Sequence, residues 1–205
     1  MSKYEIINPE LDSMTRYDID NLIGNVFVYH FHLLGEALFG FLMQNLLLKN
    51  ARRVETFAIY HSQLYFQQIH IIIYKLILDN SGKSSINFQK LLNLILKKNF
   101  KPEIESEIKN IRTDFNSEII KKYNDLLEHM RIFRTKSNAH IVAVPIEAKT
   151  HLKADSDSYS GEIIPMIQDF FKQYIRLLDL YKIKHDLYQY TDINELIKKR
   201  MSFVI

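Results

Sequence analysis

The sequence predicts an all-α protein: a helical bundle in one domain over residues 1–205. Only five glycines and four prolines occur in 205 residues, too few for the many tight turns of a β-sandwich. Apolar residues recur at helical spacing over long segments. We therefore expect about five main helices forming a core over about residues 14–185, followed by a C-terminal helical extension over residues 186–205.

The first half of the chain predicts two long helices. Asp12 or Ser13 is placed to cap a helix that ends near Asn50. A second helix is expected from Ala51 to Asp79. Its later part, Ile69–Leu78, is apolar nearly all round and rich in β-branched residues, so a buried strand competes there. The length of the flanking pattern favours a buried helix.

Shorter elements are expected next. The polar stretch 80–85 is a turn, and the 3-1-3 spacing of apolar residues from Phe88 to Ile95 predicts a short amphipathic helix. Pro102 starts a charged helix that extends to Asp114. A better marked helix then leads into Arg134, with an apolar stripe formed by Ile119, Tyr123, Leu126, Leu127, Met130 and Phe133.

The C-terminal part combines a polar segment with two helices. Lys149–Gly161 holds alternating serines and aspartates and is expected to be a loop. A long helix follows, and Asp192 is placed to cap a short last helix that ends near Val204. The stripe of the long helix consists of Ile163, Ile167, Phe170, Phe171, Tyr174, Leu177, Leu178 and Tyr181.

Composition excludes several kinds of chemistry. The chain has no cysteine, which rules out disulfides, thiolate metal sites and cysteine nucleophiles. Neither the pair His30 and His32 nor the pair His61 and His70 falls on one helix face. We therefore expect no metal and no cofactor. The net charge of +3 is too small to indicate nucleic-acid binding without local clustering.

The most apolar region predicts a buried helix and no membrane span. Leu22–Leu48 is interrupted by polar and charged residues, including His30 and Glu36, whereas a span needs about 20 mostly apolar residues. No apolar run follows Lys3, so no secretory signal is expected. These observations and the lack of cysteine favour a cytoplasmic protein.

A basic cluster follows the best marked helix. Between Glu128 and His140 lie three cations, Arg131, Arg134 and Lys136, against one acid, which gives a local charge of +2 with histidines neutral. The residues Ser137–Asn138 are poor in helix interiors and good at caps. We therefore expect the helix to break there.

That break matters for the chemistry of Arg134 and His140. In an unbroken helix the two residues point about 120° apart, whereas a break near Ser137–Asn138 lets them converge. A neutral histidine can act on the 2′-hydroxyl or the leaving oxygen of RNA as base or acid. A guanidinium can hold the phosphoryl oxygens. The expected products are a 2′,3′-cyclic phosphate and a 5′-hydroxyl, with no metal needed.

The segment Arg134-Thr-Lys-Ser-Asn-Ala-His140 resembles the R-x(4–6)-H signature of the HEPN superfamily. The fuller Arg-x-Lys-x-x-Ala-His pattern resembles its abortive-infection (Abi) U-type branch. The apolar Ile72–Asp79 and the leucine-rich Ile86–Leu92 are similar to helices of that branch. The resemblance covers about residues 57–142.

The resemblance implies a helical bundle that forms a homodimer, with two motifs facing a shared cleft. It implies a metal-independent ribonuclease of a toxin–antitoxin or phage-defence system, with RNA as substrate and an antitoxin protein as a partner. Arg134 would bind and polarise the phosphate, and His140 would be the acid–base residue. Lys136, Arg131 and Asn138 are the expected RNA-phosphate contacts.

Other interpretations stay open. Arg134 and His140 are also residue types that cap a helix C-terminus, and Lys136 and Arg131 are equally compatible with a solvated face. Many family members have Asn, Asp or His where this chain has Thr135. The alternative function is a non-catalytic HEPN module that binds a partner protein or a nucleotide.

Overall fold

The computed structural model describes residues 13–50, 55–79, 86–139 and 156–201. Those residues form helices joined by short turns and contain no strand. The all-α prediction is therefore confirmed.

The chain begins with one long rod. It consists of α2 (Arg16–Asn21), the π-helical segment η1 (Leu22–Phe27) and α3 (Val28–Asn50). Thr15 caps the rod, because its Oγ1 accepts a hydrogen bond from Asp18 N at 3.3 Å and the Asp18 carboxylate accepts one from Thr15 N at 2.7 Å. The structure places the cap at Thr15, so the prediction of Ser13 as the cap is wrong, and Asp12 lies outside the described residues.

The second helix, α4 (Glu55–Ile73), continues into the π-helical segment η2 (Tyr74–Leu78). It packs closely against α3. A Cβ at Gly40 would lie 2.5 Å from the Tyr65 ring, and Ser62 Oγ donates a hydrogen bond to Asn45 Oδ1 at 3.2 Å. The predicted helix over residues 51–79 is thus confirmed for its described part, and the competing strand is excluded.

The middle of the chain forms α5 (Phe88–Lys98), the 3-10 turn η3 (Pro102–Ile104), α6 (Glu105–Asp114) and the π-helical segment η4 (Phe115–Lys121). Asn87 caps α5 by accepting a hydrogen bond from Lys90 N at 2.8 Å. These elements agree with the short amphipathic helix and the charged helix that the sequence predicts.

The C-terminal part forms α9 (Ser156–Leu180), the 3-10 turn η5 (Leu187–Tyr190) and α10 (Ile193–Met201). The apolar stripe of α9 is buried, and Asp192 Oδ1 accepts a hydrogen bond from Glu195 N at 3.1 Å, as predicted for the cap. The loop predicted over Lys149–Gly161 is wrong from Ser156 onward, where α9 already begins. Its serines and aspartates suit a first helical turn, because they favour helix N-termini.

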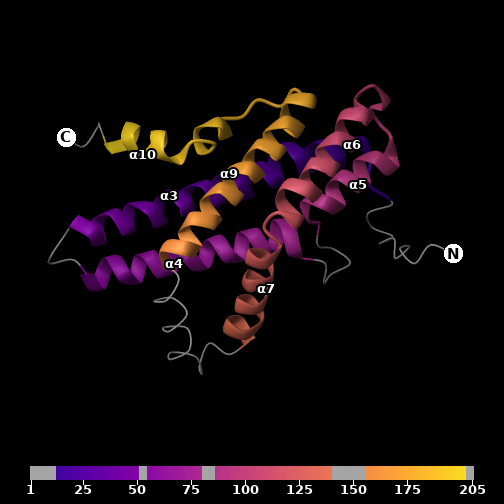
Figure 1. Cartoon of the computed structure of the whole chain (residues 1–205). Coiled ribbons are helices and arrows are strands. Elements are labelled where there is room, and N and C mark those ends of the chain that lie inside the picture. The colour runs from indigo at the N-terminus through magenta and orange to yellow at the C-terminus, as the bar shows by residue number, and fades with distance from the viewer. Residues whose placement is uncertain (1–12, 51–54, 80–85, 140–155, 202–205) are drawn as a thin grey trace.

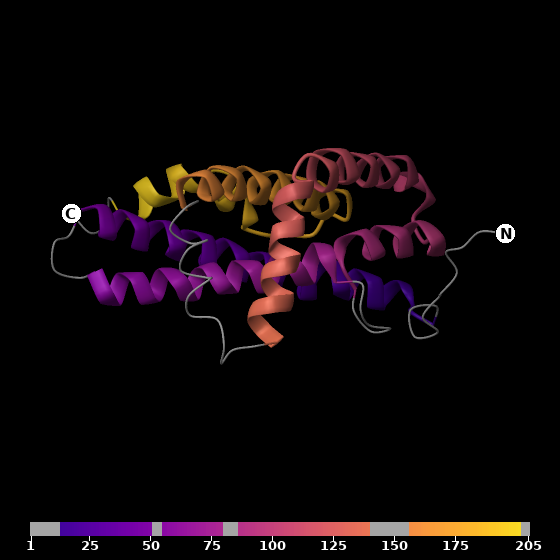
Figure 2. The same ribbon diagram turned by 60° about the horizontal axis from the view of Figure 1, so that its bottom comes forward.

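The helices form two layers with the core between them (Figures 1 and 2). The α2–η1–α3 rod, α4 and α5 form one layer, and α6, α9 and α10 form the other. Aromatic rings fill the space between the layers. The rings of Phe31 and Tyr174 stack at 4.0 Å, and Phe88 packs edge-on against Phe170 at 5.4 Å.

The C-terminal extension docks on α3. Tyr190 Oη donates a hydrogen bond to Glu36 Oε1 at 2.6 Å, and Arg200 donates two to the same carboxylate at 2.8 and 3.1 Å. A Cβ at Gly35 would lie 2.5 Å from the Tyr190 ring, so glycine is needed for this close approach. The extension is therefore packed against the bundle.

One helical stretch among the described residues, Arg16–Leu46, is long and apolar enough to span a membrane by length and composition. Its best window has a mean hydropathy of 1.5, and 44% of that window is buried. The core helix of a soluble protein meets the same criterion. The cytoplasmic location stays a prediction.

Candidate functional site

Helix α7 (Asn124–Ala139) carries the basic cluster, and its start is fixed to α9. The carboxylate of Asp169 accepts hydrogen bonds from Lys122 Nζ at 2.9 Å, Tyr123 Oη at 3.0 Å and Lys172 Nζ at 3.0 Å. Burial raises the pKa of the Asp169 carboxyl, but these three donors outweigh burial and leave the pKa below its ordinary value. The Asp169 carboxylate is therefore ionised at neutral pH and joins α9 to the start of α7.

The two halves of α7 have different surroundings. Leu126, Leu127 and Met130 in the first half are buried in the core. The second half extends past α4 and away from the two layers (Figures 1 and 2). The basic cluster thus begins where the helix leaves the bundle.

Arg131 lies at that exit and is engaged by an acid one turn earlier. Its Nε and NH2 groups donate hydrogen bonds of 2.8 Å to the two carboxylate oxygens of Glu128. This pair raises the pKa of Arg131 and lowers that of Glu128. The role of Arg131 in binding RNA stays a prediction, and a phosphate there would compete with Glu128.

Arg134, Lys136 and Asn138 all lie within the helical backbone of α7, and their side chains lie outside the described part. His140 lies outside the described residues as well. The break expected at Ser137–Asn138 is wrong, because α7 continues through both residues to Ala139. Ser137 and Asn138 are residue types that favour helix caps, but here both lie inside the helix.

A buried histidine lies close to the base of α7. His70 is 3% exposed, and its Nδ1 is 2.7 Å from the carbonyl oxygen of Phe66. Burial, helped by the nearby His129 and opposed by the hydrogen bond to Phe66, lowers the pKa of His70 to about 4. His70 is therefore a neutral core residue at physiological pH. Within the described ranges no three His, Cys, Asp or Glu residues gather as a metal site.

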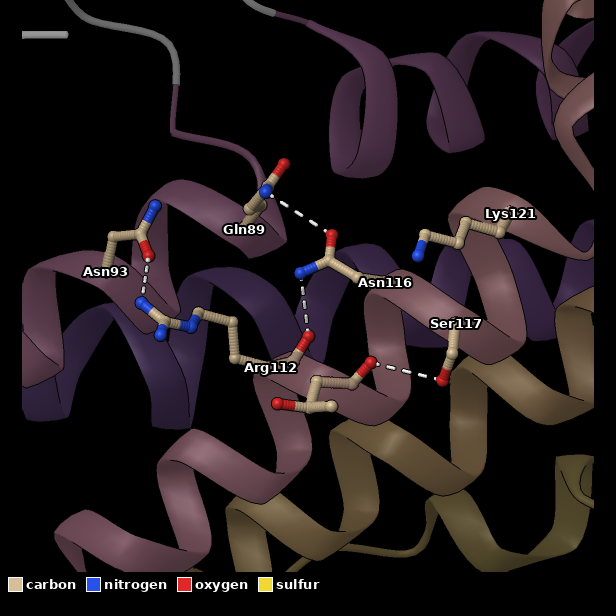
Figure 3. Close-up of a pocket in the computed structure, with 7 residues that line it drawn as sticks. Gln89, Asn93, Arg112, Asn116, Ser117 and Lys121 are labelled. Atoms are coloured by element: carbon tan, nitrogen blue, oxygen red, sulfur yellow. Dashed lines mark hydrogen bonds between the residues drawn. The ribbon is translucent and has the colours of Figure 1, made fainter.

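A second candidate site is a polar groove between α5 and the consecutive elements α6 and η4 (Figure 3). Its volume is about 480 Å³. Two interhelical hydrogen bonds cross it: Arg112 NH1 to Asn93 Oδ1 at 3.3 Å, and Gln89 Nε2 to Asn116 Oδ1 at 3.4 Å. The groove is lined by Gln89, Asn93, Arg112, Thr113, Asn116, Ser117 and Lys121.

Sequence reasoning missed this groove. Taken alone, α6 has the pattern of a solvated charged helix, and α5 that of an ordinary amphipathic one. The residues that α5 contributes to the groove, Gln89 and Asn93, are isolated amides on an amphipathic helix and give no signal of their own. Only the packing of α5 against α6 and η4 brings the polar sides of these elements together.

No family model, no curated protein and no solved structure matches this chain.

Proposed function

We propose that the chain is a metal-independent endoribonuclease that acts as a homodimer, with Arg134 and His140 as its catalytic residues. The observation that supports the proposal is the Arg134…His140 motif at the end of α7; since α7 is unbroken up to Ala139, the proposal relies on the facing motifs of the homodimer to bring an arginine and a histidine to one phosphate. Position 134 lies in the last turns of this helix, and His140 follows its last described residue, Ala139. The part of the helix that carries the motif extends from the bundle (Figure 2), where a long polymer has access.

The proposed reaction uses the 2′-hydroxyl of RNA as the nucleophile. One histidine accepts the proton of this hydroxyl while its oxygen bonds to phosphorus. The bond from phosphorus to the 5′-oxygen breaks, and that oxygen takes a proton from a histidine acting as acid. Arg134 stabilises the charge on the phosphoryl oxygens. In a homodimer, two copies of His140 supply the base and the acid.

The test is cleavage of a fluorescently labelled single-stranded RNA in excess chelator. Arg134→Ala and His140→Ala are each expected to lower the rate by at least about a hundredfold, the scale of acid–base and charge stabilisation. Arg16→Ala and His30→Ala serve as matched controls of the same residue types far along the chain. Cleavage that survives both motif substitutions would exclude the proposal.

The biological setting, a toxin–antitoxin or abortive-infection system, rests on the motif resemblance. It predicts that expression of the wild-type chain arrests growth of a bacterial host and that His140→Ala relieves the arrest. Growth arrest that persists in His140→Ala at equal expression would count against a toxic ribonuclease.

The second candidate function is a non-catalytic HEPN module that binds a partner protein or a nucleotide. Thr135 favours it, because this residue lacks the amide, carboxylate or imidazole found after the arginine in many family members. The same assay separates the two functions. The non-catalytic module predicts no RNA cleavage by the wild-type protein and a stable complex with its partner.

A further inference from the structure

We infer that the groove between α5 and α6–η4 binds the phosphodiester backbone of an RNA strand and leads that strand toward α7. The choice of RNA rests on the proposed function. The binding chemistry itself rests on the charge and the hydrogen-bonding groups of the groove (Figure 3).

The groove is positively charged, because its lining residues include two cations and no acid. Lys121 is exposed and has no ion-pair partner in the described part of the chain. Arg112 is half-buried, and the described residues give its guanidinium one partner, the neutral amide of Asn93. Two cations without acidic partners attract a polyanion.

Two acids of the helix formed by α6 and η4 are paired on its other side, against α9. Asp114 accepts a hydrogen bond from Arg176 NH1 at 2.6 Å, and Glu118 accepts one from Gln173 Nε2 at 2.7 Å. Both partners belong to α9. Neither of these two acids lines the groove; of the other acids of α6, Glu105 pairs with Lys109 and Glu107 is exposed.

The amides of the groove can exchange their present contacts for a ligand. The hydrogen bond between Gln89 and Asn116 is 3.4 Å long, near the upper limit for such bonds. Replacing it by a bond to a phosphate or a ribose hydroxyl therefore costs little. In Figure 3 the Lys121 ammonium points toward Asn116, so a cation and an amide face the same space.

The groove lies next to the start of the helix that carries the proposed catalytic residues. Lys121 ends η4, and α7 begins three residues later at Asn124. With a rise of about 1.5 Å per residue, α7 is roughly 24 Å long. A strand held at Lys121 and following α7 reaches the helix end that carries Arg134.

The experiment measures binding of a fully 2′-O-methylated RNA, which lacks the nucleophilic hydroxyl and is not cleaved. Fluorescence anisotropy compares wild type with Arg112→Gln/Lys121→Gln. Loss of two phosphate contacts is expected to weaken binding by about tenfold and to lower the slope of log affinity against log salt by about 1.4. Lys198→Gln/Lys199→Gln on α10 removes the same charge elsewhere and is expected to leave the affinity within about twofold.

A second variant adds charge and does not depend on damaging the groove. Thr113→Lys places a cation on an exposed lining position whose hydroxyl donates only to its own helix, at Lys109 O, and tighter RNA binding with a steeper salt slope is expected. Unchanged binding in both groove variants, or equal losses in the groove and α10 double variants, would overturn the inference.

The outcomes separate the two proposals. Wild-type cleavage together with unaltered binding by the groove variants overturns the groove and leaves the ribonuclease intact. Weakened binding in Arg112→Gln/Lys121→Gln without any wild-type cleavage supports the groove and excludes the ribonuclease.

Discussion

The two sides of the helix formed by α6 and η4 differ in how tightly their polar side chains are hydrogen-bonded. On the side of α9, Asp114 and Glu118 are matched by Arg176 and Gln173 at 2.6 and 2.7 Å. On the side of α5 the contacts are longer: Arg112 donates to the amide of Asn93 at 3.3 Å, and the amides of Gln89 and Asn116 bond at 3.4 Å. The difference indicates that the α9 side holds the bundle together, whereas the α5 side is available to a ligand.

The largest expected difference in the free energy of unfolding is between the alanine substitutions of two glutamines. Gln173 is 4% exposed and is bonded to Glu118 and to Arg176, so Gln173→Ala leaves both charged groups short of a partner and is expected to cost about 2 kcal/mol. Gln89→Ala removes one long bond in an open groove and is expected to cost at most about 0.5 kcal/mol. Urea unfolding measures both. Equal losses would show that the two sides do not differ.

A smaller difference in the free energy of unfolding is expected between the methionine substitutions of two arginines. Arg176 pairs with Asp114 and also donates to Gln173 Oε1 at 2.8 Å. Because the pair is partly exposed, Arg176→Met is expected to lower the free energy of unfolding by about 1 kcal/mol. Arg112→Met should change it by at most about 0.5 kcal/mol but weaken RNA binding. The comparison fails if Arg112→Met is the more destabilising of the two.

The smallest expected effect is a pH dependence of stability that comes from Asp169, which joins α9 to the start of α7. The pKa of Asp169 is lowered in the folded state, so this residue stabilises the fold above its unfolded pKa, and that contribution is lost as pH falls through the folded pKa. In Asp169→Asn the loss of stability below about pH 4 should be shallower, by less than about 1 kcal/mol. Thermal unfolding at several pH values measures it; curves parallel to those of wild type would contradict the assignment.

The long helices were predictable because their apolar residues repeat at helical spacing and become the core. The stripe from Ile163 to Tyr181 is an example, as is the cap at Asp192. The cap at Thr15 could not be predicted, because three neighbouring residues suit an N-cap. The reciprocal hydrogen bonds with Asp18 decide among them. The π-helical segments have no comparable sequence signal.

The two candidate sites also differ in whether they can be predicted from the sequence. The Arg134…His140 motif is readable from sequence because its residue types and spacing are local. The groove is not, because Gln89 and Asn116 are 27 residues apart and meet only through packing. The break expected at Ser137–Asn138 failed because capping preference is weaker than the continuation of a helix already formed.

The contact of Glu36 with Tyr190 and Arg200 also has a consequence for folding kinetics. These hydrogen bonds join residues 154 and 164 positions apart, so forming them closes a very long loop. We expect this contact to form after the folding transition state. Substituting Tyr190 with Phe should then speed unfolding while leaving the folding rate nearly unchanged. In this way the docking of α10 and η5 on α3 sets the lifetime of the folded bundle more than the speed with which it assembles.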